Sequence, residues 1–413
     1  MNMNARRQYL KVLQERYFMA KSRKDKSSIL DEYCKNTHQN RKYAIRRIRS
    51  FSSVPKERRK RKQTYDGYVK VALAKLWEIF DYPCGQRLAP LLKTETSRLR
   101  QLEEIFISSE VVQKLATISP ATIDRKLKHQ REVLHLNRKR GGPKPASLLY
   151  KKVPIRLTEW DTSELGFLEI DLVIHCGSSP LGLYICSLNT VEISSGWWEA
   201  EAIMGKGQDP TFKALKGIRK RTPFEWKGID SDNGPEFINH HLINYCEKEN
   251  LEFTRSRPNK KNDNAYIEQK NWTHVRKVFG YFRYDTDEEL ILMNSLYEKE
   301  LRLYKNFFSP VMKLTRKERV GGRVKRKYDV PKTPYQRLIE SGQISDEKKK
   351  ELQIIYRTLN PAELKRKIEE KTHRLYQLYE QKKRTTGANP SKKQRPRSVT
   401  NYMIQPPSIG LRG

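Results

Sequence analysis

The chain has 413 residues, more than one compact core usually holds, and its 84 Lys and Arg against 48 Asp and Glu give a formal net charge of +36. This charge predicts a polyanionic partner, and nucleic acid fits better than a membrane, because the chain has neither a run of about 18 apolar residues nor an apolar leader. The five cysteines are scattered, odd in number and without a C-x-x-C pair, which argues against a disulfide framework or a zinc ribbon and favours a reducing cytoplasm.

The first fifty residues predict a small helical domain. Three short helices are expected, over 6–20, 27–37 and 40–50. Ser28 is the expected cap of the second helix, and Tyr43, Ile45 and Ile48 of the third can face a core. This layout is typical of a helix-turn-helix, although a basic surface helix of any helical domain has the same pattern. The basic residues that would face DNA are Lys42, Arg46, Arg47 and Arg49.

A basic linker, 54–63, leads to a second helical region. Within that region, 108–131 has apolar residues at helical spacing that break at Ser119-Pro120 and then resume, which predicts a second helix-turn-helix. A plain helical hairpin is the alternative. The residues that the later helix would present to DNA are Thr122, Arg125, Lys126 and Lys128. The segment 137–152, rich in Gly, Pro and Lys, is expected to be a flexible connector.

The pattern then changes from helical spacing to strands. Three strand-like runs separated by short turns predict an antiparallel meander, over 165–174, 181–190 and 196–204. Helices and strands are then expected to alternate, over 209–221 (helix), 224–230 (strand), 236–250 (helix), 251–257 (strand) and 263–282 (helix). The order predicts one mixed five-stranded sheet with helices on its faces, an α/β core.

The C-terminal third is predicted to be mostly helical and basic. The segment 302–338 mixes aromatic with basic residues, so it could bind DNA by stacking and phosphate contact, or its aromatics could be core. The segment 361–384 predicts a long helix that packs on the protein or pairs with a second subunit. The tail, 385–413, has Gly, Pro and basic residues without an acid, which is typical of disorder.

Three carboxylates stand in unusual places. Asp171 lies in the most apolar predicted strand, where a carboxylate is costly unless it is paired, hydrogen-bonded or bound to metal; a wet edge strand is the alternative. Asp232 ends a strand, and the turn of Asn233 and Gly234 after it leaves its side chain projecting. Glu268 shares a helical stripe with apolar residues at i+4, i+7 and i+11, so it is expected to point inward at the sheet.

Three converging carboxylates predict a divalent metal site. Mg²⁺ or Mn²⁺ suits such an all-oxygen ligand set, and two ions about 4 Å apart are the arrangement that phosphoryl transfer uses. A zinc site at His240, His241 and Cys246 can also be imagined, but these residues have no second clustered pair and are better explained as ordinary helix residues.

With these motifs the chain resembles bacterial insertion-sequence transposases, whose core is similar to that of retroviral integrases. The matching motifs are "FLEIDLV", "DSDNGPEF" and "KKNDNAYIEQ", and the 35 residues between Asp232 and Glu268 give the family's spacing. The resemblance covers about 153–285 and implies a ribonuclease-H-like core. It also implies DDE-type polynucleotidyl transfer: Asp171, Asp232 and Glu268 bind two Mg²⁺ or Mn²⁺ ions, a transposon end is cleaved, and its 3′-hydroxyl attacks target DNA.

The resemblance implies further roles and has two departures. Asn233 and Gly234 would shape the turn, and residues near the DNA backbone would be Lys260, Lys261 and Asn264. Many relatives carry a Lys or Arg seven residues after the glutamate, where this chain has Val275. The His/His/Cys/Cys zinc domain of retroviral integrases is missing as well, which favours the bacterial branch.

The sequence therefore predicts a multidomain bacterial transposase that acts on double-stranded DNA, both transposon ends and target, as a homo-oligomer. It would be cytoplasmic and would lie on the nucleoid when bound to DNA. The alternatives are a DNA-binding regulator with a catalytically inactive core and a ribonuclease that acts on RNA:DNA hybrids. The expected domains and connecting segments are 1–53, 54–64, 65–136, 137–152, 153–285, 286–384 and 385–413.

Overall fold

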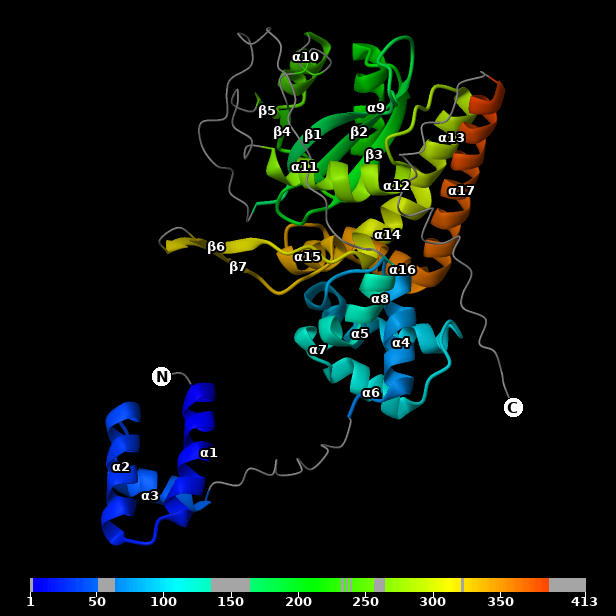
Figure 1. Cartoon of the computed structure of the whole chain (residues 1–413). Helices are drawn as coiled ribbons and strands as arrows, with labels where there is room; N and C mark the ends of the chain where they lie inside the picture. The colour runs from blue at the N-terminus through cyan, green and yellow to red at the C-terminus, as the bar shows by residue number, and fades with distance from the viewer. Residues whose placement is uncertain are drawn as a thin grey trace. The chain divides into compact units, whose positions relative to one another are not determined.

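The computed structural model describes residues 3–50, 64–134, 164–231, 234, 237, 240–255, 264–320 and 323–385 (Figure 1). Predicted features at 54–63 and 137–152 and in the tail from 386 lie outside the described residues. The chain divides into two compact units, Met1–Gln63 and Thr64–Gly413.

The first unit is a bundle of three helices that closes on a small apolar core. The helices are α1 (Met3–Met19), α2 (Arg23–Thr37) and α3 (Arg41–Ser50). The expected cap at Ser28 is wrong, because α2 begins five residues earlier, where the Ser22 hydroxyl accepts a hydrogen bond from the Asp25 backbone N–H. The core face of α3 agrees with the expected one at Ile48 and Ile45 and differs from it at Tyr43. Ala44 and Ile48, four residues apart, are fully buried, whereas the Tyr43 side chain is 38% exposed.

The second unit begins with five helices that pack against the C-terminal helices. They are α4 (Gly67–Ile79), α5 (Gly85–Gln101), α6 (Ser109–Thr117), α7 (Pro120–Lys126) and α8 (Lys128–Val133). The predicted break lies between α6 and α7, where the Ser119 side chain caps α7. The Arg98 guanidinium donates to the Tyr356 carbonyl at 2.6 Å, and the Tyr304 hydroxyl donates to the Ile79 carbonyl at 2.6 Å. These bonds join the five helices directly to the C-terminal part of the second unit.

The predicted mixed five-stranded sheet is confirmed. The strands are β1 (Phe167–Ile174), β2 (Ile185–Glu192), β3 (Trp198–Met204), β4 (Gly228–Ser231) and β5 (Glu252–Arg255). Their order is β3-β2-β1-β4-β5; β1, β2 and β3 form an antiparallel meander, while β4 and β5 run parallel to β1. The meander's short turns explain the antiparallel half, and the crossover helices explain the parallel half.

The alternation of side chains along β1 separates the two faces of the sheet. Leu168 and Ile170 pack in the cluster formed with α9 (Gln208–Arg221) and α10 (His240–Lys248). Val173, of opposite parity, packs in the cluster with the helix that crosses the other face. We call this other face the carboxylate face, because it carries Glu169, Asp171 and, in register with Glu169 on the parallel strand β4, Asp230.

One helix of three parts covers the carboxylate face (Figure 1). It consists of α11 (Ala265–Lys270), the π-helical turn η1 (Asn271–Arg276) and α12 (Lys277–Phe279). The expected inward stripe is wrong for Glu268, which is exposed, as is Trp272, whose side chain is 56% exposed. The wide π-helical turn holds one extra residue, so the apolar stripe after it is rotated relative to Glu268. The buried positions are Ile267, Lys270, His274, Val275 and Phe279.

The C-terminal part consists of helices and one hairpin. The elements are α13 (Asp287–Ser295), the π-helical η2 (Leu296–Glu300), α14 (Leu301–Phe308), β6 (Leu314–Val320), β7 (Arg323–Tyr328), α15 (Pro334–Ser341), α16 (Asp346–Thr358) and α17 (Pro361–Thr385). Within 302–338, the aromatic residues of α14 are buried, while the basic β6–β7 hairpin is exposed. The long helix α17 packs on the protein through Leu364, Ile368 and Leu375. Among the described helices, none has the length and apolarity needed to cross a membrane.

Candidate active site

Asp171 lies next to two strands of the sheet. It is paired with Asn189 of β2, and it directly follows Ile170, which is paired with Ser231, the last described residue of the parallel strand β4. The side chain is therefore beside the carboxyl end of a parallel strand, where open α/β sheets place functional groups. Asp171 is half-buried, so its carboxylate is held by protein without being closed off from solvent.

Hydrogen bonds hold the Asp171 carboxylate. Its Oδ1 accepts from the Leu172 backbone N–H at 2.8 Å, and its Oδ2 accepts from Nδ2 of Asn271 at 2.5 Å. The Asn271 amide oxygen in turn accepts from Asn189 Nδ2, and the Asn189 amide oxygen accepts from the Trp198 indole N–H. Asn189 and Trp198 are fully buried. The orientation of the carboxylate is thus connected to the rigid centre of the sheet.

A second buried carboxylate holds the covering helix in place. Glu169, two residues before Asp171, is 1% exposed, and its Oε2 accepts from the backbone N–H of Ile267 at 2.9 Å. This N–H belongs to the first turn of α11, whose backbone donors have no partner within the helix. The adjacent residue is Glu268, so Glu169 fixes the turn of helix that presents Glu268.

The structure brings the neighbourhood of Glu268 to Asp171. Asn271 contacts Asp171 and lies three residues after Glu268, which places Glu268 one helical turn away on an adjacent face. The sequence reasoning missed Asn271, Asn189 and Glu169. Asn271 could have been found because it lies three residues after Glu268 on the same predicted helix. Glu169 could have been found because it lies two residues before Asp171 and so faces the same side of the strand.

The third predicted carboxylate, Asp232, lies outside the described residues, as does Asn233. Gly234 is described, and its carbonyl accepts from the Phe237 N–H at 3.1 Å, so a turn follows β4. Asp230, which the sequence could not separate from Asp232 by parity, is fully buried and accepts from the Thr254 hydroxyl at 2.6 Å. This hydrogen bond connects β4 to β5.

The donor chemistry of Asp171 and Glu268 fits a hard divalent cation, since both supply carboxylate oxygens. Within the described ranges, no three His, Cys, Asp or Glu side chains are grouped closely enough to hold a metal ion. The predicted ligand set also includes Asp232, which is not among the described residues, so this finding does not test the predicted metal site. For the zinc alternative, Cys246 is 1% exposed, and the side chains of His240 and His241 lie outside the description.

The basic residues after Glu268 on the covering helix are engaged by the protein. Val275, at the position where the resemblance implied a cation, is fully buried. Arg276 donates to the Ile174 carbonyl at 2.8 Å and stacks over the Tyr281 ring, while burial lowers its pKa. Lys277 pairs with Asp81 at 2.6 Å. Arg276 and Lys277 thus hold the helix in place.

Lys270 and His274 occupy the inward side of the same helix. Lys270 is 4% exposed and its Nζ lies 3.3 Å from His274 Nε2. Burial, together with the positive charges of Arg87 and Lys305, lowers the pKa of Lys270 to about 7. Burial also holds the pKa of His274 well below its usual range. Both side chains are therefore largely neutral above pH 7.

The predicted DNA-contacting residues differ in their exposure and in their bonds to other residues of the chain. On α3, Lys42, Arg46 and Arg49 are exposed and Arg47 is half-buried. In the second helical region, Arg125 bonds to Thr122, Lys126 donates to the Tyr65 carbonyl at 2.6 Å and Lys128 lies 3.9 Å from Glu132. Asn264 is the N-cap residue of α11 and is half-buried, while Lys260 and Lys261 lie outside the described residues.

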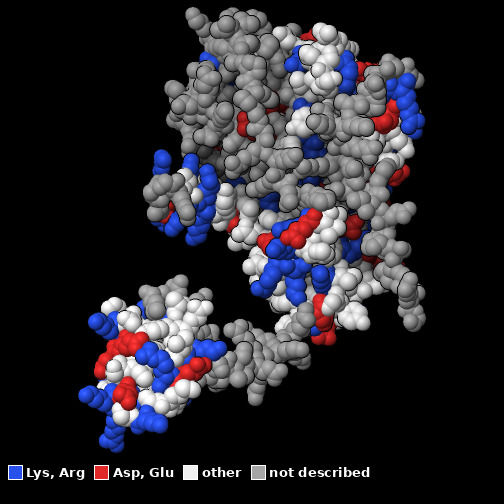
Figure 2. Space-filling model, viewed as in Figure 1, with Lys and Arg blue, Asp and Glu red and all other residues white. Residues whose placement is uncertain are grey.

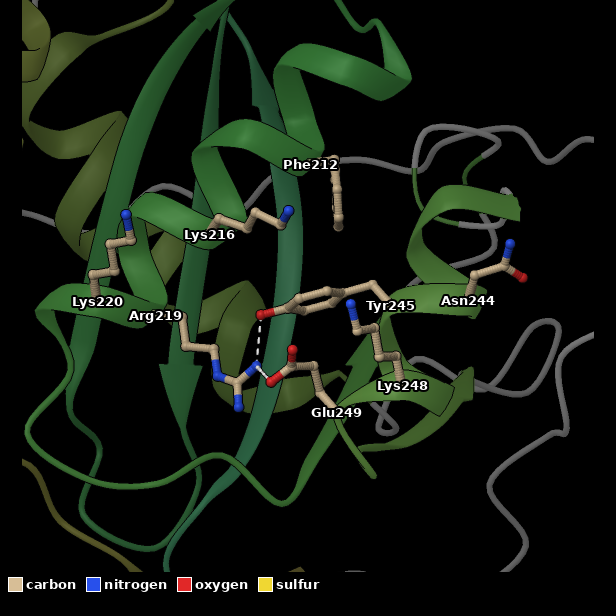
Figure 3. A pocket seen from close by; sticks show the side chains of 8 residues that line it. All are labelled: Phe212, Lys216, Arg219, Lys220, Asn244, Tyr245, Lys248 and Glu249. Carbon is tan, nitrogen blue, oxygen red and sulfur yellow. Dashed lines mark hydrogen bonds and ion pairs between the residues drawn. The ribbon is translucent and has the colours of Figure 1, made fainter.

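A separate cavity of about 530 Å³ is lined by residues of α9 and α10 (Figure 3). These helices pack on the sheet face of Leu168 and Ile170, opposite to that of Asp171. Arg219 crosses it and bonds to both the Tyr245 hydroxyl at 2.5 Å and Glu249 at 3.0 Å. The Lys216 ammonium lies 4.4 Å from the centre of the Phe212 ring. Because the sheet separates it from the carboxylate face, this cavity is not part of the candidate active site.

The solved structures that resemble the chain include two retroviral integrase cores. The catalytic core domain of BIV integrase is 18% identical, with a TM-score of 0.29, and the match covers 43% of this chain and 95% of that one. The HTLV-2 integrase catalytic core domain in complex with magnesium is 14% identical, with a TM-score of 0.27, and the match covers 35% of this chain and 89% of that one.

No family model matches the chain. A relative in sequence is the uncharacterized protein y4rM of Sinorhizobium fredii (strain NBRC 101917 / NGR234), which is 36% identical over 338 residues, 81% of this chain and 95% of the relative. The chain belongs to the same family as y4rM.

Proposed function

We propose that the chain is a transposase of the DDE type, which cleaves DNA at transposon ends and transfers the freed strand to target DNA with a ribonuclease-H-like core. The single observation that carries this proposal is the contact between Asn271 and Asp171. It joins the aspartate of the central strand to the helix that carries Glu268, and a two-aspartate, one-glutamate site requires that pairing. The strand order of the sheet, with a meander followed by two parallel strands, supports the same proposal.

Asp171, Asp232 and Glu268 would hold two Mg²⁺ or Mn²⁺ ions, which when bound would activate the attacking oxygen and stabilise the leaving one. The protein's own contribution is orientation. Asn271 and the Leu172 N–H fix the Asp171 carboxylate, and Glu169 fixes the turn of helix that presents Glu268. Such pre-organisation of metal ligands is a large part of what a protein supplies to phosphoryl transfer.

The test is strand cleavage and strand transfer on a labelled duplex that carries the DNA flanking the gene, with Mg²⁺ or Mn²⁺ and, as control, EDTA. We expect Asp171→Asn to lose activity by about 1000-fold, because a neutral amide replaces one of the carboxylates proposed to hold the metal ions. End binding should be unchanged. Full activity of Asp171→Asn would overturn the proposal.

Asp230→Asn is the matched control, because it makes the same chemical change two residues from Asp232 and on the same face as Asp171. Asp230 bonds to Thr254, and the amide of asparagine can keep that bond, so we expect activity within about fivefold of the parent chain. Specific binding without metal-dependent cleavage in the unmodified chain would favour a DNA-binding regulator. A preference for RNA:DNA hybrids would favour a ribonuclease.

A further inference from the structure

The β6–β7 hairpin is a two-stranded ribbon that buries neither of its faces in the described structure. All of its described side chains are exposed, including Leu314, Val324 and Tyr328, which are 47%, 40% and 46% exposed. A two-stranded hairpin without a buried face is marginal in water. The basic residues between 314 and 328 are Arg316, Lys317, Arg319, Arg323, Lys325, Arg326 and Lys327, and Glu318 is the acid. The cluster of basic side chains is visible at the left of the second unit (Figure 2).

The register of the hairpin places like charges opposite each other. Arg316 is paired with Lys327, and Lys317 is paired with Arg326. Directly opposed like charges destabilise an antiparallel pair by a few tenths of a kcal/mol or more. The folded hairpin therefore carries a charge density that a bound polyanion would relieve.

The two faces of the ribbon both carry cations and differ in whether an acid lies among them. Cross-strand partners share a face, so Arg316, Lys325 and Lys327 lie together with Glu318, which pairs with Arg316. The opposite face carries Lys317, Arg319 and Arg326 together with the exposed Leu314, Val324 and Tyr328. Within the described part of the chain these three cations have no ion pair and no acidic neighbour on their face. We call the face of Lys317, Arg319 and Arg326 the cationic face.

The base of the hairpin is fixed to the body of the protein. Asp329 accepts from the Lys313 backbone N–H at 2.7 Å and from the Arg337 guanidinium at 2.7 Å, and Arg337 also donates to the Val311 carbonyl at 3.1 Å. Arg337 lies on α15 and its side chain is 11% exposed. The direction in which the ribbon leaves the protein is therefore defined, and among its described residues the outer part is joined by the β6–β7 ladder.

We propose that the β6–β7 hairpin is a double-stranded DNA-binding arm whose cationic face contacts the phosphates that border the major groove. A two-stranded ribbon fits that groove, and the phosphates that line it supply the continuous negative charge that three cations without an ion pair on one face attract. This inference rests on the proposed function for its choice of DNA. It does not depend on catalysis.

The experiment compares two triple variants of the full chain that remove the same charge from opposite faces. Lys317→Gln/Arg319→Gln/Arg326→Gln changes the cationic face, and Arg316→Gln/Lys325→Gln/Lys327→Gln changes the other. Binding to a labelled 30-base-pair duplex is measured in EDTA over a range of salt concentrations. Loss of three phosphate contacts should weaken binding on the order of 100-fold near 0.15 M salt and lower the slope of log K against log salt by about 3. The control variant should bind within about fivefold of the parent chain.

Equal losses in the two variants, or no loss in either, would overturn the proposal. So would an equal loss for single-stranded RNA of the same length, which would indicate an arm for nucleic acid in general. The measurement needs no cleavage, so it separates the two proposals. Asp171→Asn should bind the duplex like the parent chain; a chain that binds through the hairpin and never cleaves overturns the proposed function alone.

Discussion

The carboxylate face of the sheet and the cationic face of the hairpin are both dense in charge, and they differ in how that charge is satisfied. On the sheet, hydrogen bonds from the chain itself reach Glu169, Asp171 and Asp230. On the hairpin, Lys317 and Arg326 face one another without an ion pair to any described residue.

The difference follows from burial. A carboxylate inside a sheet must be bonded, because desolvation without partners costs several kcal/mol. An exposed cation loses little by remaining unpaired, since water solvates it. Internal hydrogen bonds therefore indicate where a precise geometry is maintained, and an unpaired exposed cluster indicates where a partner of opposite charge can bind. The same rule applies to a third region, the group of lysine side chains around the Asp81 carboxylate.

The largest predicted effect is on stability at Asp81, whose carboxylate lies 2.6 Å from Lys277, 2.9 Å from Lys365 and 3.8 Å from Lys305. Burial alone would raise the pKa of Asp81, but these ammonium groups hold it well below its usual range. Asp81→Asn removes the anion that these three cations share, and Lys365 alone of the three keeps a second ion-pair partner, Glu369 at 3.4 Å, among the described residues. We therefore expect the free energy of unfolding at pH 7 to fall by about 3 kcal/mol. Denaturant titration of the full chain measures this.

The pH dependence gives this first prediction its sign. Because the folded-state pKa of Asp81 is lowered, its contribution is present above about pH 4 and is lost as the pH falls further. The difference between Asp81→Asn and the parent chain should therefore shrink in acid. Asp346→Asn, at a position whose side chain is 84% exposed, is the control and should change stability by less than about 0.5 kcal/mol. A similarly small change at Asp81 would contradict the argument.

The next effect is on activity through Asn271. Asn271→Leu removes the donor to Asp171 and leaves the Asn189 amide without its acceptor. Groups that orient metal ligands typically contribute 10–100-fold, so we expect strand transfer to fall by roughly that factor. The metal concentration for half-maximal rate should rise, a change that loss of packing alone would not produce. Gln269→Leu, an exposed amide on the same helix, is the control. A parent-like metal dependence in Asn271→Leu would show that the amide does not position Asp171.

A smaller effect, of opposite sign, is expected at Lys270. Its folded-state pKa of about 7 lies below the ordinary value, so between pH 7 and about 10 the unfolded chain binds a proton that the folded chain does not. Stability should rise with pH over this window through Lys270. Lys270→Met should therefore raise the midpoint of thermal unfolding near pH 7 by a few degrees and flatten its pH dependence. Lys299→Met, at an exposed position, should do neither.

These residues also show what the sequence could and could not predict. Strand positions and their order followed from alternation and turn residues, and Asp171 lies on the face that its parity predicted. The orientation of Glu268 was wrong because the π-helical turn η1 adds a residue, which regular helical spacing does not anticipate. The hairpin was missed because basic residues fill both faces and hide the alternation, although the sequence Gly321-Gly322 is typical of two-residue hairpin turns.

The smallest predicted effect is the sharpest test of the comparison, because folding and binding should change in opposite directions. Lys317→Glu places an acid opposite Arg326 and replaces a repulsive cross-strand pair with an attractive one. We expect the hairpin itself to become more stable by roughly 0.2–1 kcal/mol, measured as slower amide hydrogen exchange in β6 and β7. DNA binding by the same variant should weaken, because one cation of the cationic face becomes an anion. If amide protection of the hairpin and affinity for DNA both fell, the charges of the hairpin would stabilise its fold. The contrast between the carboxylate face and the cationic face would then be wrong.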